Sequence, residues 1–216
     1  MLPTGAMLRA ALTLGLFAAV GVFLVALTHA GTRDRIAEVE RQALLRNLHA
    51  VIRPEAHDND PTADVIEVQD PLFLGAEGPV PVYRARLAGQ PVAAILTPVA
   101  PDGYAGVIQL IVAVHYDGTV AGVRVLSHRE TPGLGDLLEE RRSPWITRFA
   151  GCSLGDPPAE QWKVKRDGGA FDQFTGATIT PRSVVKAVRH TLEYVRAHRE
   201  TLFAPAPAAA AAQRSE

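Results

Sequence analysis

The segment 171–181 gathers the residues of this chain that are best suited to binding a phosphorylated ligand. It reads Phe-Asp-Gln-Phe-Thr-Gly-Ala-Thr-Ile-Thr-Pro and leads into a predicted helix that begins near Pro181. We expect Thr180 to be the N-cap of that helix, because it stands directly before a proline in the first helical position. Its hydroxyl would then lie among unpaired backbone N–H groups at the positive end of the helix dipole, a place that favours an anion, phosphate in particular. Gly176 and Ala177 would let such a ligand approach the backbone closely.

An ordinary helix cap explains the same threonine without any ligand. Threonine is a frequent cap of amphipathic helices, so the position of Thr180 alone leaves both interpretations open. A second segment rich in small residues, 127–135, reads Ser-His-Arg-Glu-Thr-Pro-Gly-Leu-Gly. By itself it is typical of a Pro-Gly turn that leaves a hairpin. It is not a dinucleotide-binding fingerprint, because Leu138 stands where the third glycine would be.

The strongest strand signal lies just before this second segment. Residues 107–116 and 119–127 are two predicted strands, and the Asp117-Gly118 pair between them predicts a type I′ hairpin turn. The first of these strands is apolar on both faces. We therefore expect it to be central in a sheet and covered on both sides.

Helix and strand patterns elsewhere complete the predicted domain. Apolar residues recur at helical spacing over 34–52, and Pro54 ends that predicted helix. The final helix carries an apolar face made of Val184, Val185, Val188, Leu192 and Val195. Other strands are predicted at 65–68, 82–87, 91–98 and around 162–165, and short helices at 136–142 and 144–150. The pattern predicts a mixed sheet with flanking helices, in the α+β class.

The N-terminal region is predicted to be a membrane anchor. No charged residue stands between Arg9 and Arg33, and as a helix this segment would span the roughly 30 Å hydrocarbon layer of a bilayer. A cleaved secretory signal is the alternative, although Thr28 and Ala30 make a poor cleavage site. Three parts are predicted: an anchor over 1–31, one domain over 32–203 and a disordered Ala/Pro-rich tail over 204–216.

Composition excludes several classes of protein. The chain has 22 basic and 23 acidic residues, a net charge of −1 and one cysteine. A single cysteine cannot form an intrachain disulfide, a Cys-rich zinc site or an iron–sulfur cluster. The histidines lack metal-ligand spacing, so we expect no metal site. Balanced charge without a Lys/Arg block argues against nucleic acid as a partner.

The spacing Asp172-x-x-Thr175-Gly176-Ala177-Thr178-x-Thr180 resembles the motif at which FMN is attached covalently in the FMN-binding domains of membrane redox complexes. The resemblance implies that Thr180 carries the flavin through a phosphoester. It also implies that a separate magnesium-dependent flavin transferase recognises Asp172 and installs the group, with FAD as the donor.

Segment 127–135 resembles the loop of the same family that packs near the isoalloxazine ring. With the anchor and the stretch 162–169, the resemblance covers most of the chain and is specifically to the G subunits of Rnf electron transport complexes. The related C subunits of sodium-translocating quinone reductases are the alternative. Besides Thr180, the residues assigned to the FMN site are Thr175, Gly176, Ala177, Thr178, Glu130, Thr131, Gly133, Leu134, Gly135 and, as a cation near the phosphate or ring, Lys165.

The resemblance further implies an electron-relay subunit of an ion-translocating complex rather than a stand-alone enzyme, and no catalytic residue is assigned. Implied partners are the other subunits, the flavin transferase and membrane lipid, with the flavin domain on the periplasmic side of the inner membrane. The basic residues around the apolar segment, counted alone, would place the domain in the cytoplasm; we follow the resemblance. An alternative of a different class is a cofactor-free, membrane-anchored interaction or sensor domain, in which the threonine turn is only a cap.

Overall fold

The computed structural model describes residues 4–205, and these divide into two compact units between Leu44 and Leu45. The first unit is the N-terminal part of one continuous helix, α1 (Thr4–Val51). Within it, Met7–Arg33 has a mean hydropathy of 2.5 and exposed side chains, so it is long and apolar enough to cross a membrane. The helix predicted over 34–52 continues this apolar segment without a break and ends before Pro54, as expected.

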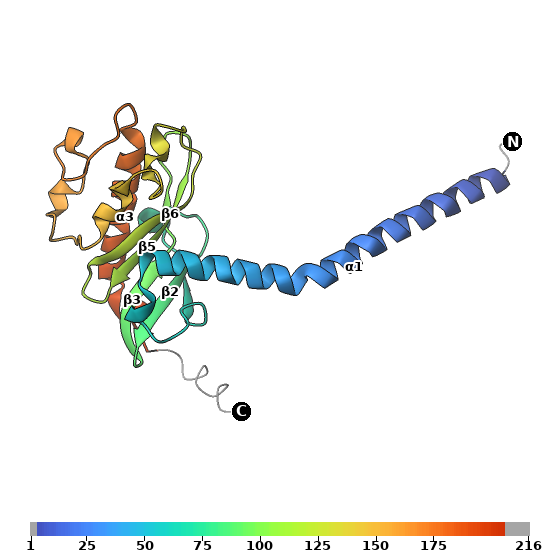
Figure 1. The fold of residues 1–216 in the computed structure, drawn as a ribbon, viewed down its shortest axis with the longest axis horizontal. Coiled ribbons are helices and arrows are strands. Elements are labelled where there is room, and N and C mark those ends of the chain that lie inside the picture. Colours follow the sequence, from blue (N-terminus) through green and yellow to red (C-terminus); the bar gives the residue numbers. More distant parts are fainter. Residues whose placement is uncertain (1–3, 206–216) are drawn as a thin grey trace. The chain divides into compact units, whose positions relative to one another are not determined.

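The second unit is built on a six-stranded sheet with the strand order β1-β2-β3-β5-β4, and β6 pairs with the other edge of β5 (Figure 1). The strands are β1 (Val65–Val68), β2 (Val80–Leu87), β3 (Gln90–Leu96), β4 (Val99–Ala100), β5 (Ile108–His115) and β6 (Val120–Ser127). The predicted α+β class is confirmed. Its strands pair antiparallel throughout, so the sheet is antiparallel rather than mixed. Antiparallel order follows from the short connections, which cannot make the crossover that a parallel pair needs.

The turn between β5 and β6 differs from the predicted type I′ turn. A type I′ turn requires a positive φ at both central residues. Gly118 has a φ of +91°, but Asp117 does not have a positive φ, since Ala88 is the one non-glycine residue with a positive φ in the described part of the chain. The N–H of Gly118 instead donates to the carbonyl of His115 at 2.9 Å. The Asp117 carboxylate accepts from Thr119 N (2.9 Å) and Oγ1 (2.7 Å), which lowers the pKa of Asp117 and makes the wider loop self-supporting.

Strand β5 is central and buried on both faces, as its sequence predicts. On one face of the sheet lies α3 (Ile179–Ala197) (Figure 1). This helix buries its predicted apolar face of Val184, Val185, Val188, Leu192 and Val195. Each such side chain contributes about 1.5–3 kcal/mol when it is fully buried. The last turn of α1 packs on β6, where a Cβ on Gly122 would lie 2.7 Å from the carbonyl oxygen of Val51. Glycine at position 122 is therefore what allows the helix end to lie on the sheet.

The chain between β6 and α3 folds mainly into 3-10 turns and aromatic contacts. The predicted short helices are the 3-10 turns η2 (Gly135–Leu138) and η3 (Pro144–Phe149). The strand predicted around 162–165 is wrong, because only a single bridge joins Val164 to Phe171. There the chain reverses so tightly that a Cβ on Gly169 would lie 2.0 Å from the carbonyl oxygen of Lys163, which leaves no room for a ladder. Buried rings fill this region, with centroid distances of 4.8 Å for Phe149–Phe171 and 5.0 Å for Trp145–Phe174.

The shorter elements complete the second unit. They are α2 (Pro71–Leu74), α4 (Arg199–Leu202), η1 (Pro54–Ala56), η4 (Ala159–Gln161) and η5 (Lys165–Asp167).

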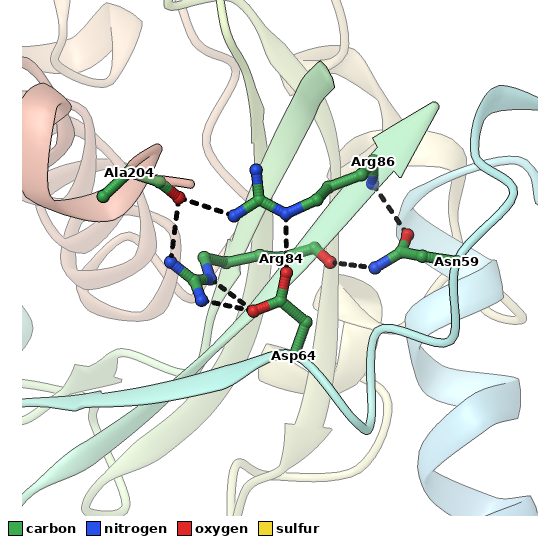
Figure 2. A network of polar contacts seen from close by, with 5 residues as sticks. All are labelled: Asn59, Asp64, Arg84, Arg86 and Ala204. Carbon is green, nitrogen blue, oxygen red and sulfur yellow. Dashed lines mark hydrogen bonds and ion pairs between the residues drawn. The ribbon is translucent and has the colours of Figure 1, made fainter. Parts of the chain in front are cut away.

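Two buried arginines on β2 hold the end of the described chain (Figure 2). Arg84 and Arg86 are 4% and 5% exposed and both pair with Asp64, whose Oδ2 lies 2.6 Å from Arg86 Nε. Both guanidinium groups also donate to the carbonyl of Ala204, at 3.2 and 2.6 Å. Asn59 adds bonds to the β2 backbone at both arginines. Ala204, the first residue of the predicted tail, is thus bonded to the domain; the predicted tail from residue 206 on lies outside the described residues.

Candidate functional site

The first turn of α3 carries the threonines of segment 171–181. The helix begins at Ile179, and its N-cap is Thr178, which makes no side-chain capping bond. The prediction that Thr180 is the N-cap is therefore wrong. The carbonyl of Thr178 already accepts from Arg182 N at 3.3 Å, so the helical ladder starts before Thr180. Pro181 is tolerated inside the first turn because a backbone N–H there has no helical partner to lose.

Thr180 is free of capping and instead makes a buried contact with Glu130. Its side chain is 0% exposed, and its Oγ1 donates a hydrogen bond to Glu130 Oε2. Glu130 is 4% exposed, and its Oε1 accepts from the N–H of Ala105 at 3.0 Å. The two segments singled out in the sequence, 127–135 and 171–181, therefore meet through this pair.

The loop after β6 positions Glu130 through a histidine. The N–H of Glu130 donates to His128 Nδ1 at 3.1 Å, so His128 Nε2 carries the proton and donates to Glu139 Oε1 at 2.8 Å. Glu139 also accepts from Arg141. Hydrogen bonds from Arg141 and then His128 lower the pKa of Glu139 to about 2, so its carboxylate stays charged and keeps the His128 ring in place.

Gly135 lies directly over the Thr180–Glu130 pair. A Cβ at this position would lie 2.8 Å from Glu130 Oε2 and 3.1 Å from Thr180 Oγ1. The N–H of Gly135 donates to the carbonyl of Thr131 at 3.0 Å, which holds the turn in this place. Glycine at position 135 therefore lets this turn pack closely against the Thr180–Glu130 pair.

Thr180 and Glu130 also line a cavity of about 300 Å³ between the loop after β6 and the start of α3. Its lining consists of Tyr104, Glu130, Thr131, Leu134, Gly135, Gly176, Ala177, Thr178, Ile179 and Thr180. Most of the residues assigned to the site from the sequence thus lie around one cavity. Four predicted residues lie outside this lining: Gly133, Thr175, Lys165 and Asp172. The lining also includes Tyr104 and Ile179, which were not predicted from the sequence.

Lys165 is turned toward Asp172 rather than toward the cavity. Its Nζ lies 2.5 Å from Asp172 Oδ1, and Arg148 pairs with the other carboxylate oxygen. The backbone carbonyl of Asp172 accepts from Trp145 Nε1 at 2.7 Å, which fixes this residue to the aromatic cluster. Asp172 is still 37% exposed at its side chain, so a protein partner can reach it.

A different cation contacts the cavity lining. Arg166 Nη1 donates to Thr178 Oγ1 at 3.4 Å, and the Arg166 backbone N–H donates to Gln173 Oε1 at 3.2 Å. The sequence signal for Arg166 was the basic run 163–166, in which no pattern marks one residue above its neighbours. The fold selects Arg166 because η5 turns the chain toward α3 at this point.

Comparisons with known proteins agree with this site. A family model described as the FMN-binding domain matches residues 103–193, and one described as the RnfG N-terminal region matches residues 1–51. A protein of Pseudomonas aeruginosa, named as the G subunit of an ion-translocating oxidoreductase complex, is 54% identical over 94% of this chain and 95% of its own length. The chain belongs to the family of G subunits of ion-translocating oxidoreductase complexes. Relatives of the same name from Shewanella baltica (47% identity, 91% of this chain, 93% of the relative) and Vibrio atlanticus (47%, 89% and 92%) agree.

The residues present fit a phosphorylated flavin of the kind that the FMN-binding domain family binds. The FMN-domain match spans both the Glu130 loop and the start of α3. The buried Thr180 lines the cavity, a Cβ at position 135 would crowd its hydroxyl, and the exposed apolar side chains of Tyr104, Leu134 and Ile179 also line the cavity. A phosphate can be bound by N–H groups at the start of α3 and by the guanidinium of Arg166, next to the Thr180 hydroxyl. An aromatic ring system can pack on the apolar side chains around the cavity.

Proposed function

We propose that this chain is the electron-relay subunit of a membrane-bound, ion-translocating oxidoreductase complex of the Rnf type and that it carries FMN covalently, through a phosphoester to Thr180. The observation that carries the proposal is the Thr180 hydroxyl. It is the one nucleophilic side chain that is buried at the cavity and hydrogen-bonded to a carboxylate in the described part of the chain. A bound flavin accepts one or two electrons, which suits a carrier between one- and two-electron partners.

The surrounding residues have distinct parts in this proposal. The backbone at Gly176, Ala177 and Thr178 borders the phosphate end, where free N–H groups of the first turn of α3 favour an anion. Arg166 supplies the positive charge for the phosphate, in place of Lys165. Tyr104 and Leu134 offer apolar surface to the ring.

Attachment requires a second protein in this proposal. A magnesium-dependent flavin transferase delivers the FMN moiety from FAD and recognises Asp172, whose side chain is partly exposed in segment 171–181. Thr175 and Gly176 are exposed in the same turn, as a docking motif must be. The subunit itself relays electrons inside the complex and is not a stand-alone enzyme.

The membrane placement completes the proposal. Met7–Arg33 anchors the chain in the inner membrane, in contact with lipid and with helices of other subunits, and the flavin domain lies on the periplasmic side. Exposed apolar side chains along this helix support a lipid or helix environment, because water would not favour them.

Intact-protein mass spectrometry tests the attachment. The full chain, produced with and without a flavin transferase, should gain the mass of FMN less water only with the transferase. Thr180→Ala should gain nothing, whereas Thr178→Ala, which changes the neighbouring threonine of the lining, should keep the adduct. Wild-type protein without an adduct, or an adduct on Thr180→Ala, contradicts the proposal; a colourless full-length protein made with the transferase would support the cofactor-free alternative.

A further inference from the structure

The carboxylate of Glu130 is buried without a cation beside it. At 4% exposure it forms no ion pair within residues 4–205, and its partners are the N–H of Ala105 and the hydroxyl of Thr180. A buried carboxylate without a cation is costly, since burial removes its hydration. Elsewhere in this domain the comparably buried Asp136 and the largely buried Asp64 do have arginine partners. Such an exception next to a ligand cavity is typical of a group kept for its chemistry.

The geometry around Glu130 is that of a nucleophile and its base. Thr180 Oγ1 donates a hydrogen bond to Glu130 Oε2, and the Ala105 N–H donates to Oε1. Oε2 is therefore the carboxylate oxygen placed to accept the proton of the Thr180 hydroxyl. His128 fixes the backbone of Glu130 from the opposite side. An activated hydroxyl typically donates a hydrogen bond to a base, and a third group orients that base. Here Thr180 is the nucleophile, Glu130 is the base, and Ala105 and His128 orient Glu130.

The cavity beside the pair has room for part of a third reactant. Position 135 lacks a side chain at the point where a Cβ would lie 3.1 Å from Thr180 Oγ1. The same cavity is lined by Gly135, Gly176 and Ala177. Thr180 lines this cavity but is fully buried, so a reacting phosphorus would reach its hydroxyl from the cavity once the lining opens there.

From these contacts we propose that Glu130 is the general base for attachment of the flavin to Thr180; this rests on the covalent attachment proposed above. Thr180 Oγ1 attacks the phosphorus of the FMN half of FAD, and Glu130 Oε2 takes the hydroxyl proton. The new bond joins Thr180 Oγ1 to phosphorus. The bond that breaks is the anhydride bond between the two phosphates, whose electron pair leaves with AMP. No atom is oxidised or reduced, and the transferase supplies the magnesium ion.

A structural role for Glu130 makes different predictions. If it only ties the loop at Ala105 to α3, an isosteric amide should serve nearly as well. Glu130→Gln keeps the shape and an acceptor for the Ala105 N–H but loses the basic oxygen. Glu130→Ala removes the carboxylate and leaves room for a small carboxylate from solution. Glu140→Gln is the matched control, because Glu140 follows the same loop, is half exposed and, within residues 4–205, forms an ion pair with Arg124 alone.

The experiment measures attachment in a single turnover with the full chain, purified transferase, FAD and magnesium, followed by intact mass. At saturating transferase, we expect Glu130→Gln and Glu130→Ala to lose about 10²-fold or more in rate constant. The transferase concentration that gives half the maximal rate should stay unchanged, and Glu140→Gln should behave as wild type. Added formate should speed Glu130→Ala, and chloride at the same ionic strength should not. Thermal unfolding of each variant checks that the domain is folded.

The outcomes separate the two proposals. A wild-type rate constant in Glu130→Gln, a loss that appears only as a higher half-saturating concentration, or folded Glu130→Ala that formate does not speed would overturn the role of Glu130. In each of these cases, attachment to wild type and not to Thr180→Ala would leave the proposed function standing. An adduct on Thr180→Ala would overturn both. If Glu130→Gln does not fold, formate rescue of Glu130→Ala decides the matter.

Discussion

Thr180 and Glu130 are joined by a buried hydrogen bond that connects the first turn of α3 to the loop after β6. The contact turns a threonine that looks like a helix cap into a group directed at a ligand cavity. It also explains why both segments rich in small residues matter, since each supplies one partner. Neighbouring residues are expected to support this pair, and ion pairs elsewhere are expected to stabilise the domain that holds it.

Gly135→Ala should block attachment while leaving the backbone unstrained, because the φ of Gly135 is not positive. The added Cβ would lie 2.8 Å from the Glu130 carboxylate and 3.1 Å from Thr180 Oγ1. We expect a destabilisation of about 1–3 kcal/mol, typical of overpacking, together with a large loss of flavin attached after a fixed time. Intact mass and chemical denaturation measure the two effects.

Gly155→Ala is the control for that substitution. A Cβ at position 155 would meet nothing closer than the Ser153 hydroxyl at 3.8 Å, and its φ is also not positive. Normal attachment and stability in this variant, with both lost in Gly135→Ala, would assign the effect to the crowded pair. Full attachment to Gly135→Ala would show that the space over Thr180 is not needed.

Arg166→Gln should weaken the use of FAD during attachment, because it removes the guanidinium next to Thr178 that is proposed to bind the phosphate. A hydrogen bond to a charged group contributes about 1.5 kcal/mol or more, which corresponds to a rise of about tenfold in the half-saturating FAD concentration. Lys163→Gln removes the same charge from the same basic run and should change this concentration little. An equal rise in the half-saturating FAD concentration in both variants would mean that only the overall positive charge of this segment matters. That rise would then become smaller at high salt, because salt screens exposed charges.

Asp64→Asn should destabilise the domain strongly. The two buried guanidinium groups of Arg84 and Arg86 share this carboxylate, and the amide would leave their charge uncompensated. Removing one partner of a buried ion pair costs about 3–5 kcal/mol, and here Arg84 and Arg86 share the Asp64 carboxylate (Figure 2). Asp102→Asn breaks the exposed pair with Lys186 and should cost less than about 1 kcal/mol. Urea denaturation of the full chain in detergent compares them, and similar midpoints would contradict this interpretation of the cluster.

The acid stability of the loop after β6 should depend on Glu139. Because its pKa is lowered from 4.5 to about 2, this carboxylate stabilises the folded state above about pH 4.5, and that contribution is lost as the pH falls through about 2. Arg141→Ala removes the largest cause and should move the pKa of Glu139 back toward 4.5. An NMR titration of the Glu139 carboxyl carbon measures this directly. An unchanged pKa in Arg141→Ala would leave His128 as its main cause.

Local signals predicted much of this domain. Apolar spacing defined α3, the end of α1 and the central strand β5, because each buries a continuous face whose period the sequence displays. The Asp-Gly pair located the hairpin but not its turn type, since Asp117 satisfies its carboxylate with Thr119 in a wider loop.

Long-range contacts were beyond such signals. Nothing in the sequence near Thr180 indicates Glu130, fifty residues earlier, because their pairing depends on how the sheet returns the chain to α3. The same holds for Arg84 and Asp64. The spacing of the motif located the threonines of the site. Which of them is the N-cap depends on the helical hydrogen bonds, which begin at the carbonyl of Thr178.

Peptide mass spectrometry of the flavin-loaded chain tests the central claim most directly. After attachment and proteolysis, fragmentation of the peptide that contains residues 171–181 should place the FMN phosphoester on Thr180. The Thr175 and Thr178 fragments should carry no added mass. A phosphoester on Thr175 or Thr178, or a flavin that leaves the chain completely on denaturation, would contradict the account.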